Sequence, residues 1–179
     1  MTQDHEIMMS VKNGDIHKLG KLFDKYSKGL YNYFQLQLND RSNSEDLVQN
    51  VFYNILKYRH TFKPGADFKT WMYTIARNEK ISFFKKRKVF NREIDPEMSD
   101  EERNTPEEDL VNSADVDHLR MALECISPDN RELIILNRFT GLPYERIAEI
   151  MDCGIGALKV RMHRALKELK DQFFKVSGE

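Results

Sequence analysis

The sequence predicts an all-α protein built from two small helical domains. Apolar residues recur every three or four positions along most of the chain, and no stretch shows the alternation typical of a β-strand. In the middle, residues 93–114 are acidic, contain Pro96 and Pro106, and include too few large apolar residues to form a core. We therefore expect one domain at 1–92, an acidic flexible linker at 93–114 and a second domain at 115–179.

Composition places the chain among folded proteins that do not enter a membrane. Hydrophobic residues make up 40% of the 179 positions and charged residues 32%, a balance typical of globular rather than disordered proteins. No apolar run approaches the roughly 20 residues that a membrane-spanning helix needs, and residues 1–10 lack a signal pattern. We therefore expect a cytoplasmic protein without membrane insertion.

Cysteine and histidine residues are too scattered to indicate a metal site. Cys125 and Cys153 lie far apart and have no companion at the spacing of metal ligands. In a cytoplasmic protein, such residues are interpreted as buried thiols rather than as a disulfide. We predict no metal, no cofactor and no catalytic residue.

Three helices are expected in the first domain, and the first of them covers about 15–38. The turn residues Asn13, Gly14 and Asp15 precede a stripe of apolar residues at helical spacing. The members of this stripe are Leu19, Leu22, Phe23, Tyr26, Leu30 and Phe34.

The second helix is expected to begin near Ser42, because the spacing of Ser42 and Glu45 is that of a capping box. Its buried face would consist of Leu47, Val48, Val51, Phe52 and Ile55. After a loop at 60–66, Asp67 can cap a third helix that ends near Lys88.

Four helices are expected in the second domain. The apolar residues of the first are Val116, Leu119, Leu123 and Ile126. Ser127 would cap the second helix, with Pro128 as its first residue. A short helix at 143–151, a turn containing Gly154 and a longer basic helix at about 155–174 form the pattern of a helix-turn-helix.

Charge is distributed unevenly, although the formal net charge is only −1. Seven basic residues stand against one acid between 77 and 92, and eleven acids stand against one base between 93 and 117. The last helix adds a second basic cluster, formed by Lys159, Arg161, Arg164, Lys167 and Lys170. Basic surfaces on two separate helices indicate two places that contact a polyanion.

The last helix has a face that suits the major groove of DNA. With about 100° per residue, its buried side would comprise Ile155, Leu158, Met162, Ala165, Leu166 and Leu169. The opposite side comprises Gly156, Val160, His163, Arg164 and Lys167, with Lys159 and Arg161 on its flanks. Arginine can bond guanine through two hydrogen bonds, and lysine can neutralise phosphate. A solvated amphipathic helix is the alternative, but the preceding turn and short helix favour DNA recognition.

Two other helices expose surfaces that could bind partners. On the second helix, the side opposite the apolar stripe consists of Asp46, Gln49, Asn50, Tyr53 and Lys57. This side fits either an ordinary solvated surface or a protein-docking surface. The third helix interleaves aromatic residues with cations, which suits a single nucleic-acid strand, although Trp71 is expected to pack in the core.

These stretches resemble the extracytoplasmic-function sigma factors of bacterial RNA polymerase. Region 2 of that family is similar to residues 44–52 (SEDLVQNVF) and 68–78 (FKTWMYTIARN). Its region 4 resembles residues 127–131 (SPDNR), 141–148 (GLPYERIA) and 159–166 (KVRMHRAL). The resemblance covers nearly the whole chain in the right order, with the acidic linker where that family has one.

The resemblance implies a non-enzymatic alternative sigma factor that binds core polymerase through the β′ clamp and the β flap and directs it to promoter DNA. It implies core binding by Asp46, Gln49, Asn50 and Tyr53. It implies contacts with the −10 element by Phe62, Lys63, Asp67, Trp71, Arg77, Asn78, Lys80, Lys85, Lys86, Arg87 and Lys88. It implies contacts with the −35 element by Gly156, Lys159, Val160, Arg161, His163, Arg164 and Lys167. The loop at 62–67, together with Asn78, would hold a base flipped out of the −10 element.

The promoter sequence and some partners stay open. Val160 stands where the family often has a small hydroxyl residue, so the −35 contact there is apolar or absent. Asn91 and Glu93 follow a basic cluster that is shorter than in some relatives. An anti-sigma factor, or another DNA-bound protein that recruits the chain, is a further partner that the sequence leaves undecided.

Two other classes of protein fit parts of the pattern. A helix-turn-helix regulator that does not join polymerase would share the last two helices, and it would need a dimerisation surface and bind DNA by itself. A nuclease would need clustered carboxylates or a His/Cys site, whereas the acids concentrate in 93–114. We therefore favour the sigma factor.

Limited proteolysis of the free protein is expected to cut first within 93–114. This segment cannot bury enough apolar surface to offset the entropy lost on ordering. First cuts inside 15–88 or 116–172, with the connector resistant, would contradict the division into two domains.

Overall fold

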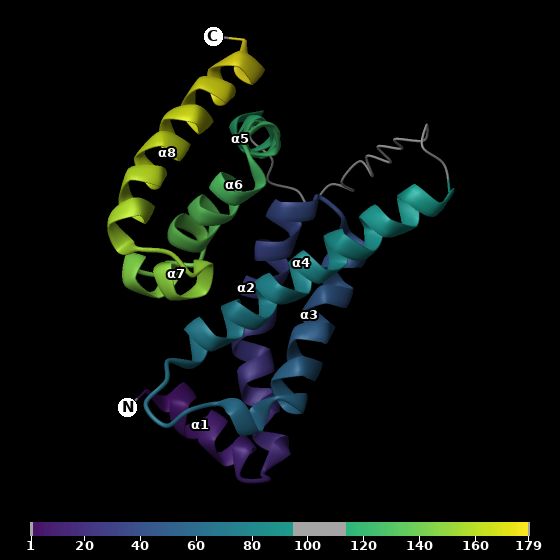
Figure 1. Ribbon diagram of the computed structural model, residues 1–179, viewed down its shortest axis with the longest axis vertical. Coiled ribbons are helices and arrows are strands. Elements are labelled where there is room, and N and C mark those ends of the chain that lie inside the picture. The colour runs from purple at the N-terminus through teal and green to yellow at the C-terminus, as the bar shows by residue number, and fades with distance from the viewer. Residues whose placement is uncertain (1, 95–113, 179) are drawn as a thin grey trace. The chain divides into compact units, whose positions relative to one another are not determined.

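The computed structural model describes residues 2–94 and 114–178, and every regular element in these residues is a helix (Figure 1). The predicted all-α fold is therefore confirmed for this part of the chain. Most of the predicted linker, residues 95–113, lies outside the described residues. The chain divides into two compact units, Met1–Phe34 with Asp40–Arg103 and Gln35–Asn39 with Asn104–Glu179.

The described part of residues 2–94 contains four α-helices and two short 3-10 helices. They are α1 (Gln3–Lys12), η1 (Ile16–Lys18), α2 (Leu19–Leu38), α3 (Arg41–Lys57), η2 (Arg59–Thr61) and α4 (Phe68–Ile94). Together, η1 and α2 correspond to the helix predicted over 15–38. The sequence reasoning missed α1, which Thr2 caps and which ends before Gly14. A φ of +111° at Gly14 lets the chain turn toward η1.

Helix α3 begins earlier than predicted, because its cap is Asp40 rather than Ser42. Asp40 Oδ1 accepts a hydrogen bond from the Asn43 amide at 3.0 Å. The Ser44 hydroxyl donates to Asp40 O at 2.6 Å. An aspartate oxygen satisfies a free amide of the first turn as well as a serine would, so the prediction of Ser42 as the cap is wrong.

Helix α4 begins as predicted but extends further. Asp67 Oδ1 accepts from the Thr70 amide at 2.8 Å and from the Thr70 hydroxyl at 2.7 Å, so Asp67 caps the helix. The helix continues to Ile94 instead of ending near Lys88. Neither proline nor glycine stands between Lys88 and Ile94, so nothing in the local sequence forces an earlier end.

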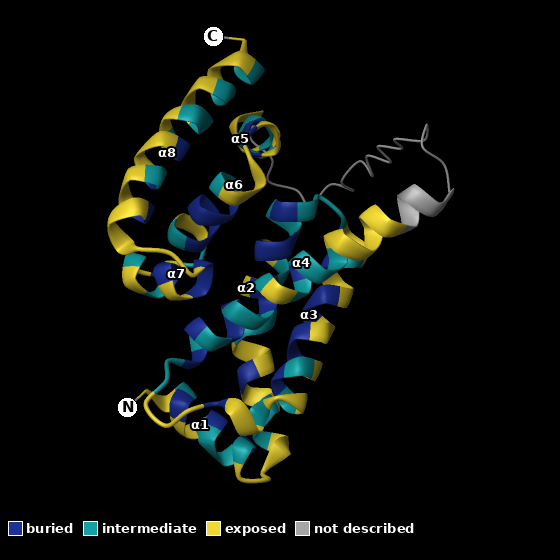
Figure 2. Cartoon of the chain, in the orientation of Figure 1, coloured by how far each residue is buried: buried dark blue, intermediate teal, exposed yellow. Residues whose placement is uncertain are grey.

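The core of the first unit forms where α3 packs on α4, and buried residues lie on both helices and on α2 (Figure 2). Aromatic side chains connect α3 and α4 to α2. All five apolar residues predicted on α3 are buried. Tyr33 of α2 meets Tyr73 of α4 edge-on, with 5.4 Å between ring centroids. Burial raises the pKa of Tyr73, which keeps its hydroxyl neutral. Phe23, predicted to be in the core stripe, is 41% exposed, and its ring lies 4.8 Å from that of Phe52.

The described part of the second unit contains the predicted helix-turn-helix. Its elements are α5 (Ala114–Cys125), α6 (Pro128–Ile134), the π-helical segment η3 (Ile135–Phe139), α7 (Tyr144–Met151) and α8 (Ile155–Ser177). Ser127 caps α6 as predicted, since its hydroxyl accepts from the Asn130 amide at 3.4 Å. Asp152, at a φ of +51°, turns the chain from α7 into α8.

Helix α8 packs on α5, α6 and α7 through the predicted face. Leu158, Met162 and Ala165 are buried. Three other predicted core residues, Leu119, Leu166 and Leu169, are half-buried. Two more are exposed, because they lie in the first turn of their helices, where fewer neighbours cover a side chain. These are Ile155, which is 40% exposed, and Val116, which is 38% exposed.

Both cysteines are exposed, so their prediction as buried thiols is wrong. Cys125 is the last residue of α5, and Cys153 lies in the turn between α7 and α8. Helix ends and turns lie at the surface, which accounts for the difference. Among the described residues, none of the helices combines the length and the hydropathy that crossing a membrane requires.

Candidate nucleic-acid and polymerase interfaces

Helix α8 exposes the face that was predicted to contact DNA. Its other face is fixed by Leu158, Met162 and Ala165, each at most 2% exposed. The exposed members of the predicted set are Gly156, Lys159, Val160, His163, Arg164 and Lys167. Val160 is 54% exposed, so an apolar group lies within a basic surface. Such a group can contact the methyl of thymine, while the basic residues around it can bond bases and phosphates.

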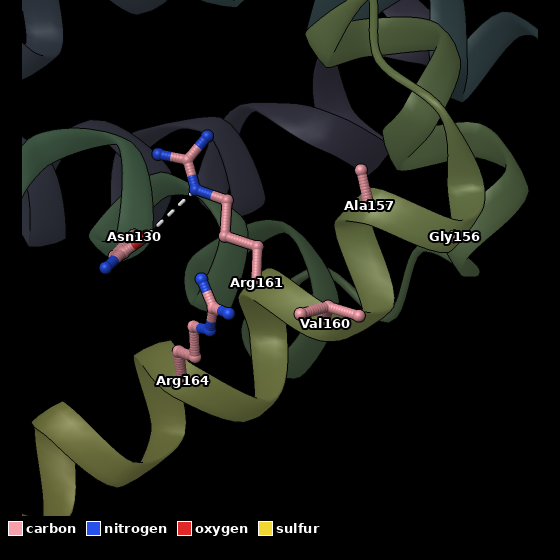
Figure 3. Close-up of a pocket in the computed structure, with 6 residues that line it drawn as sticks. All are labelled: Asn130, Gly156, Ala157, Val160, Arg161 and Arg164. Carbon is pink, nitrogen blue, oxygen red and sulfur yellow. Dashed lines mark hydrogen bonds between the residues drawn. The ribbon is translucent and has the colours of Figure 1, made fainter.

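Arg161 differs from the rest of this set because it bonds α6 (Figure 3). Its Nε donates to Asn130 Oδ1 at 2.9 Å, and its guanidinium lies 3.1 Å from the Asp129 carboxylate. Asn130 also donates to Glu168 Oε2 at 2.9 Å. These contacts fix α8 on the start of α6. The sequence reasoning missed Asp129 and Asn130, since a contact between helices about thirty residues apart leaves no local signal.

An open depression lies beside this junction (Figure 3). Its lining consists of Asn130, Gly156, Ala157, Val160, Arg161 and Arg164. A Cβ added at Gly156 would meet nothing within 4 Å, so the space above this residue is open. Lys159 Nζ lies 6.0 Å from the centroid of the Tyr144 ring, a distance at which the ring attracts the cation and can orient it. The depression therefore combines an accessible wall with cationic donors.

Helix α3 exposes the side predicted to contact core polymerase. Tyr53 is 64% exposed, and the other members are exposed as well: Asp46, Gln49 and Asn50. On another side of the helix, Asn54 Nδ2 donates to Glu79 Oε1 of α4 at 2.8 Å. Because α3 is fixed by this bond and by its buried face, its exposed side chains can be changed without disturbing the core.

The loop before α4 contains a tight turn. The Ala66 amide donates to Lys63 O at 3.1 Å, with Pro64 and Gly65 between them. Gly65 has a φ of +79°, and proline followed by a left-handed glycine is typical of a type II turn. Lys63, Pro64 and Gly65 are exposed. The backbone at the tip of this loop is therefore accessible to a ligand.

Two residues predicted to contact the −10 element, Phe62 and Lys80, have buried side chains. Phe62 is 0% exposed, and its ring centroid lies 5.2 Å from that of Trp71 and 6.3 Å from that of Phe68. Lys80 is 6% exposed. Their side chains are therefore not part of the exposed surface that is predicted to contact the −10 element. Trp71 is half-buried and packs on rings, as expected.

The remaining predicted −10 residues reach the surface to different degrees. Two of them are half-buried, namely Asp67 and Arg77. The others are exposed: Lys63, Asn78, Lys85, Lys86, Arg87 and Lys88. The last four are consecutive, and consecutive residues of a helix point in different directions. They therefore surround α4 with positive charge rather than forming one stripe.

Comparison with known proteins gives one family for both units. The family model for Sigma-70 region 2 matches residues 22–89, and that for Sigma-70 region 4 matches residues 117–169. The chain is similar to the ECF RNA polymerase sigma factor SigX of Bacillus subtilis, with 29% identity over 83% of this chain and 80% of the relative. It is also similar to the ECF RNA polymerase sigma factor EcfG of Rhodopseudomonas palustris, with 30% identity over 70% of this chain and 68% of the relative.

A solved structure extends the similarity to three dimensions. It is that of the sigma factor RpoE from Bartonella quintana, crystallised with the anti-sigma factor NepR. The TM-score is 0.76 and the identity is 28%, over 86% of this chain and 94% of that chain.

Proposed function

The chain belongs to the extracytoplasmic-function sigma factors, and from this premise we propose how its two units divide the work of promoter recognition. It is an alternative sigma factor, which binds core RNA polymerase and directs promoter-specific initiation of transcription. The rival class, a helix-turn-helix regulator that acts without polymerase, is not favoured. Such a regulator has no need of region 2, which matches residues 22–89.

The proposed domains are region 2 at 1–92 and region 4 at 115–179, connected by 93–114. The family matches support these boundaries, because region 2 ends at residue 89 and region 4 begins at residue 117. The division of labour follows from the two basic surfaces, which lie on α4 in the first domain and on α8 in the second.

The second domain contacts the −35 element through α8. The observation that supports this most directly is the solvent-facing row of Val160, His163, Arg164 and Lys167 on a helix whose other face is buried. Held in this way, α8 can enter a major groove without rearrangement. Arg161 helps to hold α8 in this position through its bonds to Asp129 and Asn130 of α6.

The first domain contacts the −10 element through the loop at 62–67 and the exposed part of α4. The turn at 63–66 offers backbone groups, and Asn78 offers an amide that can donate and accept. Together they suit the edge of a base extruded from the duplex. The exposed cations Lys85, Lys86, Arg87 and Lys88 suit the phosphates of the same strand.

Core polymerase binds the exposed side of α3, with the β flap contacting the second domain. Asp46 supplies a negative charge, Gln49 and Asn50 supply hydrogen-bonding groups, and Tyr53 supplies an aromatic ring. Aromatic residues are enriched in protein interfaces, and a carboxylate favours a basic partner surface. The test of the function as a whole is promoter-specific transcription by core polymerase reconstituted with this chain.

Lys85→Ala is expected to weaken binding to all promoters alike and to lower the salt dependence of that binding. Loss of one phosphate contact on a single strand reduces the slope of log K against log salt by roughly 0.7, and a phosphate contact carries no sequence information. Binding of the holoenzyme to matched and mutated promoters, measured over a series of salt concentrations, checks this. Lys28→Ala removes another exposed lysine, on α2, and serves as the control. A loss from Lys85→Ala that differs between promoter sequences would contradict the phosphate role.

Further partners follow from the relatives. RpoE of Bartonella quintana was crystallised with the anti-sigma factor NepR, and we propose that a protein of this class also binds this chain and keeps it from polymerase. Members of the family are non-enzymatic initiation factors, so this chain is proposed to have no catalytic activity of its own. Its place of action is the cytoplasm, where the polymerase works.

A further inference from the structure

Helix α1 holds the backbone of the −10 loop at two points. His5 Nδ1 lies 2.9 Å from Ala66 O, and Lys12 Nζ donates to Phe62 O at 2.6 Å. A carbonyl oxygen can only accept, so Nδ1 of His5 carries the hydrogen of the first bond. His5 and Lys12 are seven residues apart, about two helical turns, so both side chains leave the same side of α1.

The two bonds enclose the turn at 63–66. Phe62 O stands immediately before the turn, and Ala66 O ends it. The Phe62 ring is fully buried, and its centroid lies 5.4 Å from that of His5. The start of the turn is thus fixed by the hydrogen bond from Lys12 and by the packing of the Phe62 ring. Its end is fixed by the imidazole of His5. The exposed tip is left as the part of the loop that a base can approach.

Helix α1 is itself fixed to α2, which makes it a firm support. Asp4 accepts hydrogen bonds from Lys25 Nζ at 2.7 and 2.8 Å and from the Tyr26 hydroxyl at 2.5 Å. Burial alone would raise the pKa of Asp4, but these hydrogen bonds outweigh it and hold the pKa below its usual value. Asp4 therefore stays a carboxylate at neutral pH. Met8 and Val11 of α1 are both 0% exposed, so one side of this helix is buried in the core.

We propose that His5 and Lys12 set the base preference at the −10 element by fixing the shape of the turn at 63–66. They act through the loop backbone, as positioning residues, and the inference rests on the proposed role of loop 62–67 in holding the flipped base. A pocket made largely of backbone rejects a wrong base only if its walls keep their positions. A mobile loop would adjust to the preferred base and to a wrong base alike. Both residues lie outside the segment 22–89 that the region 2 family model matches.

The test uses variants that remove a donor and keep most of the side-chain volume. These are His5→Phe, Lys12→Met and the double variant, each as the full chain. Lys12→Arg restores a donor at the same place and should restore the wild-type behaviour. Lys18→Met is the matched control, because Lys18 bonds Ser10 and Asp15 rather than the loop.

The first readout is the order of the loop in the free chain. Trp71 is the single tryptophan of the sequence, and its ring centroid lies 5.2 Å from that of Phe62. Quenching of its fluorescence by acrylamide therefore reports on the packing at the base of the loop. The double variant should raise the quenching constant by about twofold at unchanged helix content, as expected for local loosening. Lys18→Met should match the wild type.

The second readout is transcription by reconstituted holoenzyme on a pool of promoters with a randomised −10 element. The preference for the best base over the others should fall by about three- to tenfold in the double variant, the range expected for one or two lost hydrogen bonds. Preference at the −35 element and affinity for core polymerase should stay unchanged. Lys12→Arg should retain the wild-type −10 profile.

The outcomes separate the inference from the function on which it rests. If Asn78→Ala and Lys63→Ala relax the −10 preference but the folded variants of His5 and Lys12 do not, the positioning role is overturned. If the loop variants themselves change nothing at −10, the proposed role of the loop fails, and the positioning role fails with it. Equal losses at −10 and −35 would show a general structural role and overturn the inference too. If the double variant unfolds, the same comparisons apply to His5→Phe and Lys12→Met singly.

Discussion

The double variant Asp46→Arg, Gln49→Ala is expected to remain helical yet fail to bind core RNA polymerase or start transcription. Both side chains are exposed on α3, and the opposite face of that helix is buried, so the fold does not depend on them. A carboxylate there suits a cationic partner surface, and arginine in its place would meet a like charge. Such a juxtaposition in an interface can cost several kcal/mol, and about 3 kcal/mol corresponds to a loss of more than a hundredfold in affinity.

A pull-down of core enzyme, paired with circular dichroism and transcription in vitro, measures this. Glu6→Arg makes the same change of charge on α1, outside the proposed docking surface, and should bind polymerase like the wild type. The second domain of the double variant should still bind −35 DNA, since α8 is untouched. A folded double variant that captures polymerase and supports promoter-specific transcription would contradict the docking assignment. A wild-type chain that never captures polymerase would contradict the whole interpretation.

Patterns confined to one helix could be predicted from the sequence. The five apolar residues of α3 are buried because helical periodicity alone decides which residues share a face. The predictions of Asp67 and Ser127 as caps are confirmed. Each side chain accepts a hydrogen bond from an amide only three residues ahead, so the signal is local to one helix. The exposed row of α8 follows from its buried row, and so most of the proposed −35 surface could be identified without coordinates.

Features that depend on contacts between distant segments could not be predicted. Phe62 looked like part of an exposed loop, but its ring fills a space between α1 and α4, and α1 itself was missed. Lys80 looked like one more cation of a basic run, yet it lies on the buried side of α4. Arg161 looked like a DNA contact, and its bonds to Asp129 and Asn130 became visible only in the folded chain. For Phe62 and Arg161 the partner lies on another element, where periodicity carries no information.

Arg164→Ala is expected to weaken use of a cognate promoter by about 1–3 kcal/mol and to relax preference at one −35 position, as for the loss of a bidentate contact with a base. Arg164 is exposed at the edge of the open depression on α8, so its removal should leave the melting temperature unchanged. Holoenzyme binding to promoters that differ at single −35 positions measures the preference directly.

Two further variants separate base recognition from charge and from stability. Arg164→Lys keeps the charge but not the planar fork that bonds guanine twice, so it should restore affinity in part and leave the preference relaxed. Arg161→Ala removes a side chain of the same kind from the same helix, but one that bonds Asn130 and Asp129. It should lower the melting temperature of the protein and weaken binding to all −35 sequences alike, because it removes contacts that hold α8 on α6. If Arg164→Ala instead weakened every −35 sequence equally while Arg161→Ala changed the preference at a single position, the two roles would be reversed, and the base contact would belong to Arg161.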